Sequence, residues 1–325
     1  MQGLQIEAFG NPADVVKAVE LPDVGVPAAG EVVIALEASP VNMSDLLMIS
    51  GRYGYRPQLP CVVGSEGAGR VVAVGSGVRH LKEGDRTLVP YPTPAWAERI
   101  KADAGRLRPL PSGDVDQLAM LGINPPTAYL MLTDYVSLPK GAWVIQNSAN
   151  SGVGRAFIPI AKSLGLKTVN VVRREDVVNE IKAIGGDIVL VDGPDLAKRV
   201  ATETGNAPVL LAADGVGDTS TMNLMGCLAE KAALVTYSAM SGKPFVGLGT
   251  HLIFRDISIR GFWLANWFKT AKPEQITQMY DHLAPLVASG AINTPVAATF
   301  GFNQAAEAMV AAAKMRGKVL FKAAR

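Results

Sequence analysis

The sequence predicts an α/β protein in which a doubly wound parallel sheet is inserted into a β-rich domain. Three observations support this fold class. Short apolar runs separated by Gly and Pro fill the first hundred residues, a pattern typical of a barrel-like β unit. From about Asp116 onward, helical stretches alternate with β-branched strands, and this alternation predicts a parallel sheet with helices on both faces. The tail returns to the β-rich style, so we expect the first domain to be discontinuous.

In the first domain, apolar runs predict strands at residues 31–36, 69–74 and 86–89. Turns at residues 75–77 and 83–85 contain the glycines that a positive φ angle favours. We expect this domain to span residues 1–115, with residues 295–325 returning to it.

The inserted domain is expected at residues 116–294. Its strands are predicted at residues 143–146, 168–172, 188–191, 209–213, 234–237 and 257–263, followed by an amphipathic helix at 273–289. The tail should add a strand at 295–300, a helix at 303–314 and a closing strand at 318–322.

Composition excludes some classes of function. The chain has 325 residues, a formal charge of +2 and no dense Lys/Arg tract, so we expect no nucleic-acid partner. No run of some twenty apolar residues indicates a membrane span. The N-terminal residues lack the features of a signal or transit peptide, and we therefore expect a cytoplasmic protein with no membrane partner.

Cysteine and histidine are too few and too scattered for a structural metal site. Cys61 and Cys227 lie far apart in sequence, and His80, His251 and His282 include no pair with zinc-ligand spacing. We expect both cysteines to be small core residues and expect no metal.

The most informative segment is residues 144–154, where an apolar strand meets a turn of small residues and then a helix. This layout suits the pyrophosphate of a dinucleotide, which can approach backbone N–H groups at a helix N-terminus. Against the G-x-G-x-x-G pattern, Ala149 and Ser151 take the first two glycine positions and Gly154 keeps the third. A purely structural turn is the alternative.

The expected second strand of the inserted domain ends in Arg173 and Arg174. An NAD-specific site usually carries an acidic residue there to bind the ribose 2′-hydroxyl. Two guanidinium groups instead suit a 2′-phosphate, so we predict NADPH as the cofactor. The alternative is a solvated basic turn, partly neutralised by Glu175 and Asp176.

Four segments, at residues 30–34, 41–45, 64–69 and 317–320, resemble the medium-chain dehydrogenase/reductase superfamily in type and order. The resemblance implies a Rossmann domain inserted into a GroES-like catalytic domain. Zinc alcohol dehydrogenases of this superfamily have Cys and His where this chain has Asn42 and Ser65. Neither replacement is a plausible ligand in a tetrahedral zinc site, so the resemblance points to the zinc-independent branch.

A narrower resemblance connects residues 121–129, 144–147, 150–154, 170–173 and 260–264 with the mitochondrial-type 2-enoyl thioester reductases. It implies NADPH-dependent reduction of the 2,3 double bond of a trans-2-enoyl thioester, carried on CoA or an acyl-carrier protein. A quinone or enone reductase on the same scaffold is the alternative. A cofactor-binding protein without significant reductase activity, acting through a protein or RNA partner, is the alternative from another class.

In this family a tyrosine thought to donate a proton lies in a Gly-x-Tyr-Gly motif, which residues 51–54 match. Hydride addition at Cβ makes an enolate that must be protonated at Cα. A phenol stays protonated at neutral pH and can supply that proton or bind the developing oxyanion. We therefore predict Tyr53 as the catalytic residue, with packing against the barrel as its alternative role.

The remaining site residues follow from the resemblance and from their position at strand ends. Asn124 is implied as a contact of the nicotinamide side, with an N-cap role as its alternative. Lys318 is implied as a cofactor contact, with a solvated lysine as the alternative. The other predicted cofactor contacts are Asn150, Ser151, Gly152, Val153, Tyr237, Ser238, Ala239, Met240, Phe262, Trp263 and Leu264. By default, residues 262–264 would be core or interface residues. The resemblance also implies a homodimer, with residues 257–263 at the subunit contact.

Overall fold

The computed structural model describes residues 1–323. The chain forms two compact units, one made of Met1–Ile123 with the segment from Ala271 onward, the other of Asn124–Thr270. The inserted unit is therefore shorter than the expected range of 116–294. The reason is that helices α3 (Val115–Leu118) and α11 (Pro273–Ala288) pack on each other within the first unit.

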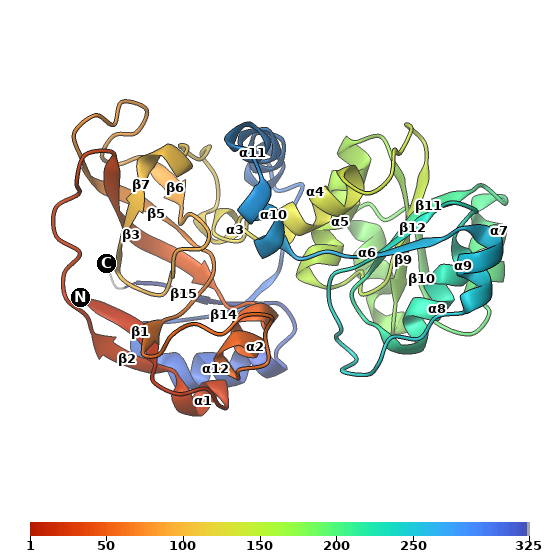
Figure 1. Ribbon diagram of the computed structural model, residues 1–325, viewed down its shortest axis with the longest axis horizontal. Helices are drawn as coiled ribbons and strands as arrows, with labels where there is room; N and C mark the ends of the chain where they lie inside the picture. The colour runs from red at the N-terminus through yellow and green to blue at the C-terminus, as the bar shows by residue number, and fades with distance from the viewer. Residues whose placement is uncertain (324–325) are drawn as a thin grey trace. The chain divides into compact units, whose positions relative to one another are not determined.

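The first unit contains two sheets (Figure 1). The larger one has the order β14-β15-β3-β5-β6, with β7 also paired to β3, and the smaller one has the order β2-β1-β4. Their strands are β1 (Gln2–Ile6), β2 (Lys17–Glu20), β3 (Glu31–Pro40), β4 (Cys61–Val62), β5 (Ala68–Val74), β6 (Arg86–Leu88), β7 (Arg99–Asp103), β14 (Val296–Phe300) and β15 (Lys318–Phe321). Besides α3 and α11, the helices are α1 (Pro12–Val15), α2 (Met43–Ile49), α12 (Ala305–Lys314) and the 3-10 turns η1 (Ala104–Arg106) and η3 (Phe302–Gln304). The predicted return of the tail brings β15 beside β3.

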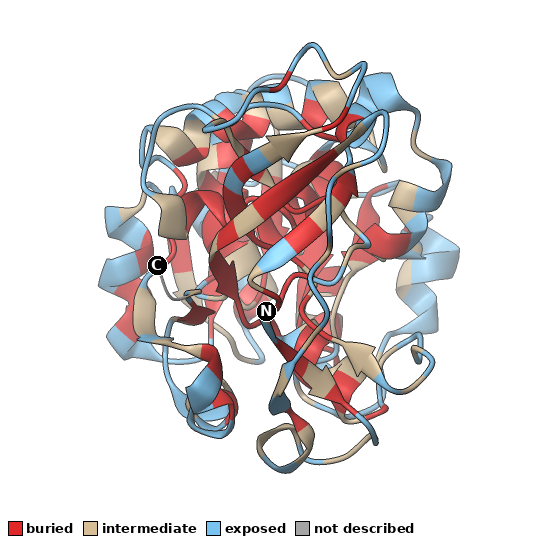
Figure 2. Ribbon diagram, turned by 90° about the vertical axis from the view of Figure 1, so that its left-hand side faces the viewer, coloured by how far each residue is buried: buried red, intermediate tan, exposed pale blue. Residues whose placement is uncertain are grey.

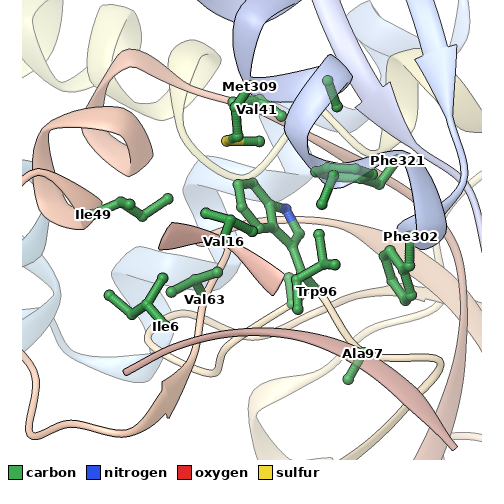
Figure 3. Close-up of a cluster of buried hydrophobic side chains, with 14 of the residues drawn as sticks. Ile6, Val16, Val41, Ile49, Val63, Trp96, Ala97, Phe302, Met309 and Phe321 are labelled. Atoms are coloured by element: carbon green, nitrogen blue, oxygen red, sulfur yellow. The ribbon is translucent and has the colours of Figure 1, made fainter. Parts of the chain in front are cut away.

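The core of the first unit is built around Trp96 (Figure 3). The indole ring meets the ring of Phe321 edge-on at 5.0 Å between centroids, and Phe302 packs on Phe321 in the same way at 5.8 Å. Gly64 has φ +89°, and a Cβ there would lie 2.3 Å from the indole ring. Only glycine combines that backbone angle with this close approach, so Trp96 ties the turn at Gly64 to the C-terminal strand.

The second unit is a parallel six-stranded sheet in the order β10-β9-β8-β11-β12-β13, with helices on both faces (Figure 1). The strands are β8 (Trp143–Gln146), β9 (Lys167–Val172), β10 (Ile188–Val191), β11 (Val209–Asp214), β12 (Ala233–Thr236) and β13 (Ser258–Gly261). The helices are α4 (Asn124–Thr133), α5 (Gly152–Ser163), α6 (Val178–Ala183), α7 (Leu196–Thr204), α8 (Asp218–Cys227), α9 (Gly249–Arg255), α10 (Leu264–Thr270) and the 3-10 turn η2 (Glu175–Val177). This doubly wound sheet confirms the predicted fold class.

The strand order reverses beside β8, because β9 and β10 lie on one side of it and β11, β12 and β13 on the other. Ligands of open α/β sheets bind at such a switch point, beyond the carboxyl ends of the strands. Figure 2 shows that buried positions concentrate on the strands, whereas outer helices and loops are exposed. The reversal of strand order beside β8 favours a ligand site at the residues that follow the central strands. Among the described residues, no helix is long and apolar enough to cross a membrane.

Candidate active site

The turn between β8 and α5 is compact because glycine stands at its third motif position. A Cβ on Gly154 would lie 2.5 Å from the carbonyl oxygen of Ser148 and 2.7 Å from the backbone of Ala149. Ser151 is the N-cap of α5, and its hydroxyl accepts a hydrogen bond from the Gly154 N–H at 3.1 Å. The Ser151 side chain thus binds one of the N–H groups that have no partner inside the helix. This cap explains why serine can stand at the second glycine position of the motif.

A buried network that sequence reasoning missed holds this turn against the loop after β11. Asn147 donates to the Asp214 carboxylate at 2.7 Å and accepts from the Gly215 N–H at 2.8 Å. The same carboxylate accepts hydrogen bonds from Val216 N, Gly217 N and the Thr221 hydroxyl. Asp214 is fully buried, so these donors stabilise its charge in place of water.

Tyr237 directly follows β12, and its hydroxyl is buried over the same turn. A Cβ on Gly215 would lie 2.6 Å from that hydroxyl, so Gly215 makes room for the phenol. Within the described chain, the hydroxyl has no partner in ordinary hydrogen-bond geometry. Burial raises the pKa of Tyr237 to about 12, with Ser151 acting in the opposite direction. A buried phenol donor beside a helix N-terminus fits a phosphate or a ribose hydroxyl of a dinucleotide.

The other predicted residues of the second unit lie around this turn. The Ser148 hydroxyl donates to the Met240 sulfur at 3.3 Å, which ties residues 237–240 to the turn. Asn124 is nearly buried, and a Cβ on Gly152 would lie 3.1 Å from its side chain. Helix α4 begins at Asn124 itself, one residue earlier than an N-cap role would require. Asn150 is exposed, and Ser151, Gly152 and Val153 are half-buried.

The two arginines after β9 differ in their surroundings. Arg174 pairs with Asp176 at 3.2 Å, with both side chains half exposed. Arg173 is exposed and forms no ion pair with any described residue. Such a surface pair adds little stability, so both guanidinium groups can turn toward an anion, Arg173 without first giving up a partner.

Phe262, Trp263 and Leu264 follow β13. Phe262 and Leu264 are buried, whereas Trp263 is half-buried. The Phe262 N–H donates to the Thr236 carbonyl at 2.8 Å. A groove of about 500 Å³ runs beside them, with Tyr135, Trp263 and Trp267 among its walls. The segment therefore belongs partly to the core and partly to a groove of mixed polar and apolar lining at the carboxyl edge of the sheet.

In the first unit, Tyr53 lies in a loop that follows helix α2. The helix ends in a Schellman motif, in which Gly51 N donates to Met48 O at 2.9 Å and Arg52 N to Leu47 O at 2.9 Å. Gly51 takes the left-handed conformation that this motif needs, with φ +70°. Tyr53 is half-buried and Tyr55 is 53% exposed.

Tyr91 is near both of these tyrosines. Burial, with smaller contributions from Tyr53 and Tyr55, raises the pKa of Tyr91 to about 12. Tyr91 is therefore protonated at neutral pH.

Asn42, Ser65 and Lys318 meet in a second polar network. Asn42 donates to Glu66 Oε1 at 2.7 Å and accepts from the Lys318 ammonium. Asp45 accepts from Ser65 Oγ at 2.5 Å and from Asn42 N at 2.8 Å. Both positions that carry zinc ligands in zinc alcohol dehydrogenases are thus engaged in hydrogen bonds. Among the described residues, no group of three or more His, Cys, Asp or Glu side chains could hold a metal ion.

Lys318 was predicted to touch the cofactor. Its ammonium lies in this network, where burial lowers its pKa and Glu66 and Asp45 act in the opposite direction. The role of Lys318 as a cofactor contact stays a prediction, as do the roles of the other predicted site residues.

The buried carboxyl of Glu66 makes stability depend on pH. Burial raises the pKa of Glu66 to about 7, so the folded chain keeps a proton that the unfolded chain releases near pH 4.5. The contribution of protonated Glu66 to the free energy of unfolding is fully present below pH 4.5 and is lost as the pH rises toward 7. We expect the free energy of unfolding to fall over this interval by about 1 kcal/mol or more beyond the fall in Glu66→Gln. Denaturant unfolding at several pH values measures this.

The exposed Glu83 provides the control. Glu83→Gln should keep the pH dependence of the unsubstituted protein, because its side chain stays in water. Equal slopes for Glu66→Gln and the unsubstituted protein would contradict the account of Glu66.

Comparisons with known proteins agree with this geometry. The family model Alcohol dehydrogenase GroES-like domain matches residues 28–146, and Zinc-binding dehydrogenase matches residues 152–284. The chain is 38% identical to a mitochondrial enoyl-acyl-carrier-protein reductase of Mus musculus over 315 residues, which cover 92% of this chain and 84% of the relative.

Two solved structures extend the comparison. The complex of the Candida tropicalis 2-enoyl thioester reductase Etr1p with NADP and crotonyl-CoA has a TM-score of 0.85 and 25% identity. A mycobacterial quinone oxidoreductase has a TM-score of 0.85 and 27% identity. In both comparisons 99% of each chain is covered. The chain therefore belongs to the medium-chain dehydrogenase/reductase superfamily and, within it, to the family of the mitochondrial enoyl-acyl-carrier-protein reductases.

Proposed function

We propose that this protein reduces the 2,3 double bond of a trans-2-enoyl thioester with NADPH. The identity with enoyl reductases over most of the chain supports the reaction, and a matching structure holds NADP and crotonyl-CoA. The observation that carries the proposal is the compact turn after β8, with the buried Tyr237 hydroxyl aimed at it. Among the described residues, none lies in ordinary hydrogen-bond geometry to that hydroxyl, and a bound dinucleotide would supply a partner.

Each part of the cofactor has residues suited to it. The pyrophosphate would lie at the N-terminus of α5, near Asn150, Ser151, Gly152 and Val153. The guanidinium groups of Arg173 and Arg174 would hold the 2′-phosphate. Residues 262–264 and Asn124 would contact the nicotinamide side, and residues 237–240 and Lys318 are proposed as further cofactor contacts. When bound, NADPH supplies the hydride that adds to Cβ of the enoyl thioester.

Tyr53 would complete the reaction. Addition at Cβ leaves an enolate, and the phenol of Tyr53 gives its proton to Cα or hydrogen-bonds the oxyanion. Asn42 and Ser65 are not ligands for a tetrahedral zinc ion. In this zinc-independent proposal, the phenol of Tyr53 and neighbouring hydrogen-bond donors stabilise the negative charge of the enolate.

A quinone or enone reductase is the second candidate, because the mycobacterial quinone oxidoreductase matches the whole fold. The expected cytoplasmic location stays a prediction, and the mouse relative carries the name mitochondrial. The choice between CoA and an acyl-carrier protein is decided by comparing turnover of the two thioesters.

The substrate assignment is tested with NADPH and either crotonyl-CoA or a naphthoquinone. We expect oxidation of NADPH with crotonyl-CoA, and expect Tyr53→Phe to lower that turnover by about 100-fold or more while NADPH affinity stays nearly unchanged. Turnover of the quinone alone would overturn the thioester assignment. Unchanged turnover in Tyr53→Phe would remove Tyr53 from the mechanism.

The cofactor assignment is tested at the end of β9. Arg173→Ala should weaken NADPH binding by about 10-fold or more and leave NADH binding almost unchanged, because only NADPH carries the 2′-phosphate. Fluorescence titration with both nucleotides measures the two affinities. Glu175→Gln, in the same turn, is the control and should not weaken NADPH. An equal loss for both nucleotides in Arg173→Ala would show that Arg173 does not bind the 2′-phosphate.

We also propose a homodimer formed through the second unit. β13 is the last strand in the sheet order, and among the described residues no further strand pairs with its outer edge; such an edge can pair with another chain. The preceding helix α9 exposes Ile253 and Phe254 to 74% and 76%. An exposed edge beside an exposed apolar patch is typical of a subunit contact. Light scattering should show twice the mass of one chain and a shift to monomer in Phe254→Asp. A monomeric unsubstituted protein would contradict the proposal.

A further inference from the structure

We infer that Arg56 is a positioning residue for Tyr53, because its guanidinium group closes the loop that carries the proposed proton donor. The inference rests on the function proposed for Tyr53. It goes beyond that function by naming the side chain that sets the geometry of the loop.

The Gly51 carbonyl is bound by the Arg56 side chain. Gly51 is the left-handed residue after α2, and its own N–H is used in the Schellman motif. Its carbonyl accepts two hydrogen bonds from one side chain, at 2.9 Å from Arg56 Nε and at 2.7 Å from Arg56 Nη2. Two N–H groups of the exposed Arg56 side chain thus meet one carbonyl in charge-assisted hydrogen bonds, and this contact joins the two ends of the loop.

The guanidinium group of Arg56 packs on the ring of Phe9. Its central carbon lies 5.6 Å from the ring centroid of Phe9, within the range of a cation–π contact. A Cβ on Gly51 would lie 3.2 Å from the Phe9 side chain, so the same ring also packs against the start of the loop. The Phe9 side chain therefore packs against both partners of the contact, the Arg56 guanidinium group and Gly51.

Tyr53 lies between Gly51 and Arg56, the two residues that this contact joins. Residues 52–55 span the interval from Gly51 to Arg56, and they include Gly54. Without this contact, glycine and exposure would let this segment sample many conformations. Displacement of a reacting group by about 1 Å can lower a rate by about 100-fold. Lysine has one compact ammonium group and cannot reproduce the two directed N–H groups of arginine.

The matched control is Arg52, which lies in the same loop and has the same charge. Its side chain is exposed, as that of Arg56 is, and in the part of the chain that the structure describes it donates to Ser50 Oγ at 3.2 Å. It does not reach the Gly51 carbonyl. Arg52→Met therefore removes the same charge from the loop without opening it.

The test measures kcat and KM for crotonyl-CoA with NADPH in Arg56→Met, Arg56→Lys and Arg52→Met, each with Tyr53 present and with Tyr53→Phe. We expect Arg56→Met to lower kcat by about 10-fold with KM and NADPH affinity nearly unchanged, Arg56→Lys to lie between, and Arg52→Met to act as the unsubstituted protein. Because Arg56 acts through Tyr53, its replacement should have no further effect in the Tyr53→Phe background.

Hydrogen exchange of the segment containing residues 51–56 provides a readout that needs no activity. Exchange should be faster in Arg56→Met than in Arg52→Met. The inference is overturned by unchanged exchange, by the same fold loss in both Tyr53 backgrounds, or by wild-type turnover in Tyr53→Phe. A raised KM for the CoA ester with unchanged kcat would instead assign Arg56 to the phosphates of the substrate. If no enoyl thioester is reduced, the proposed function fails, and unchanged or faster exchange still decides whether Arg56 closes the loop.

Discussion

The nucleotide-binding half of the protein depends on the close backbone contact at Gly154. The helix α5 can start directly against the turn because no side chain stands between Gly154 and the Ser148 carbonyl. That closeness lets Ser151 cap the helix, and it places the turn within reach of the Asn147–Asp214 hydrogen bond. The N–H groups without a partner inside α5 and the positive end of its dipole then face the same side of the turn. The pyrophosphate of a dinucleotide can bind to both.

Each unit contains a buried polar network, and some of the residues proposed to bind the cofactor lie beside it. These are the turn after β8 in the second unit and Lys318 in the first. Asp214 organises the loops after β8 and β11. Glu66 and Asp45 organise the segments around Asn42 and Ser65. Since an unpaired charge in these interiors would be costly, the networks keep their segments in one arrangement before any ligand binds.

Local patterns predicted most of the fold, whereas the roles of the predicted site residues stay predictions. Alternation of strands and helices predicted the parallel sheet, and the residues after each strand predicted its carboxyl edge. Contacts distant in sequence were missed: Asn147 meets Asp214 across 67 residues and Asn42 meets Lys318 across 276. The small sheet β2-β1-β4 was also missed, because β4 has two residues and no periodicity. An Asp-Gly pair at the end of a buried strand, as at Asp214, was the one local signal of the first network.

The central claim is that hydride goes to Cβ and a proton goes to Cα of an enoyl thioester. Deuterium tracing tests it most directly, with crotonyl-CoA reduced once by C4-deuterated NADPH in water and once by ordinary NADPH in deuterium oxide. The account predicts butyryl-CoA labelled at C3 in the first reaction and at C2 in the second. Absence of butyryl-CoA, or the cofactor's deuterium at C2, would contradict it.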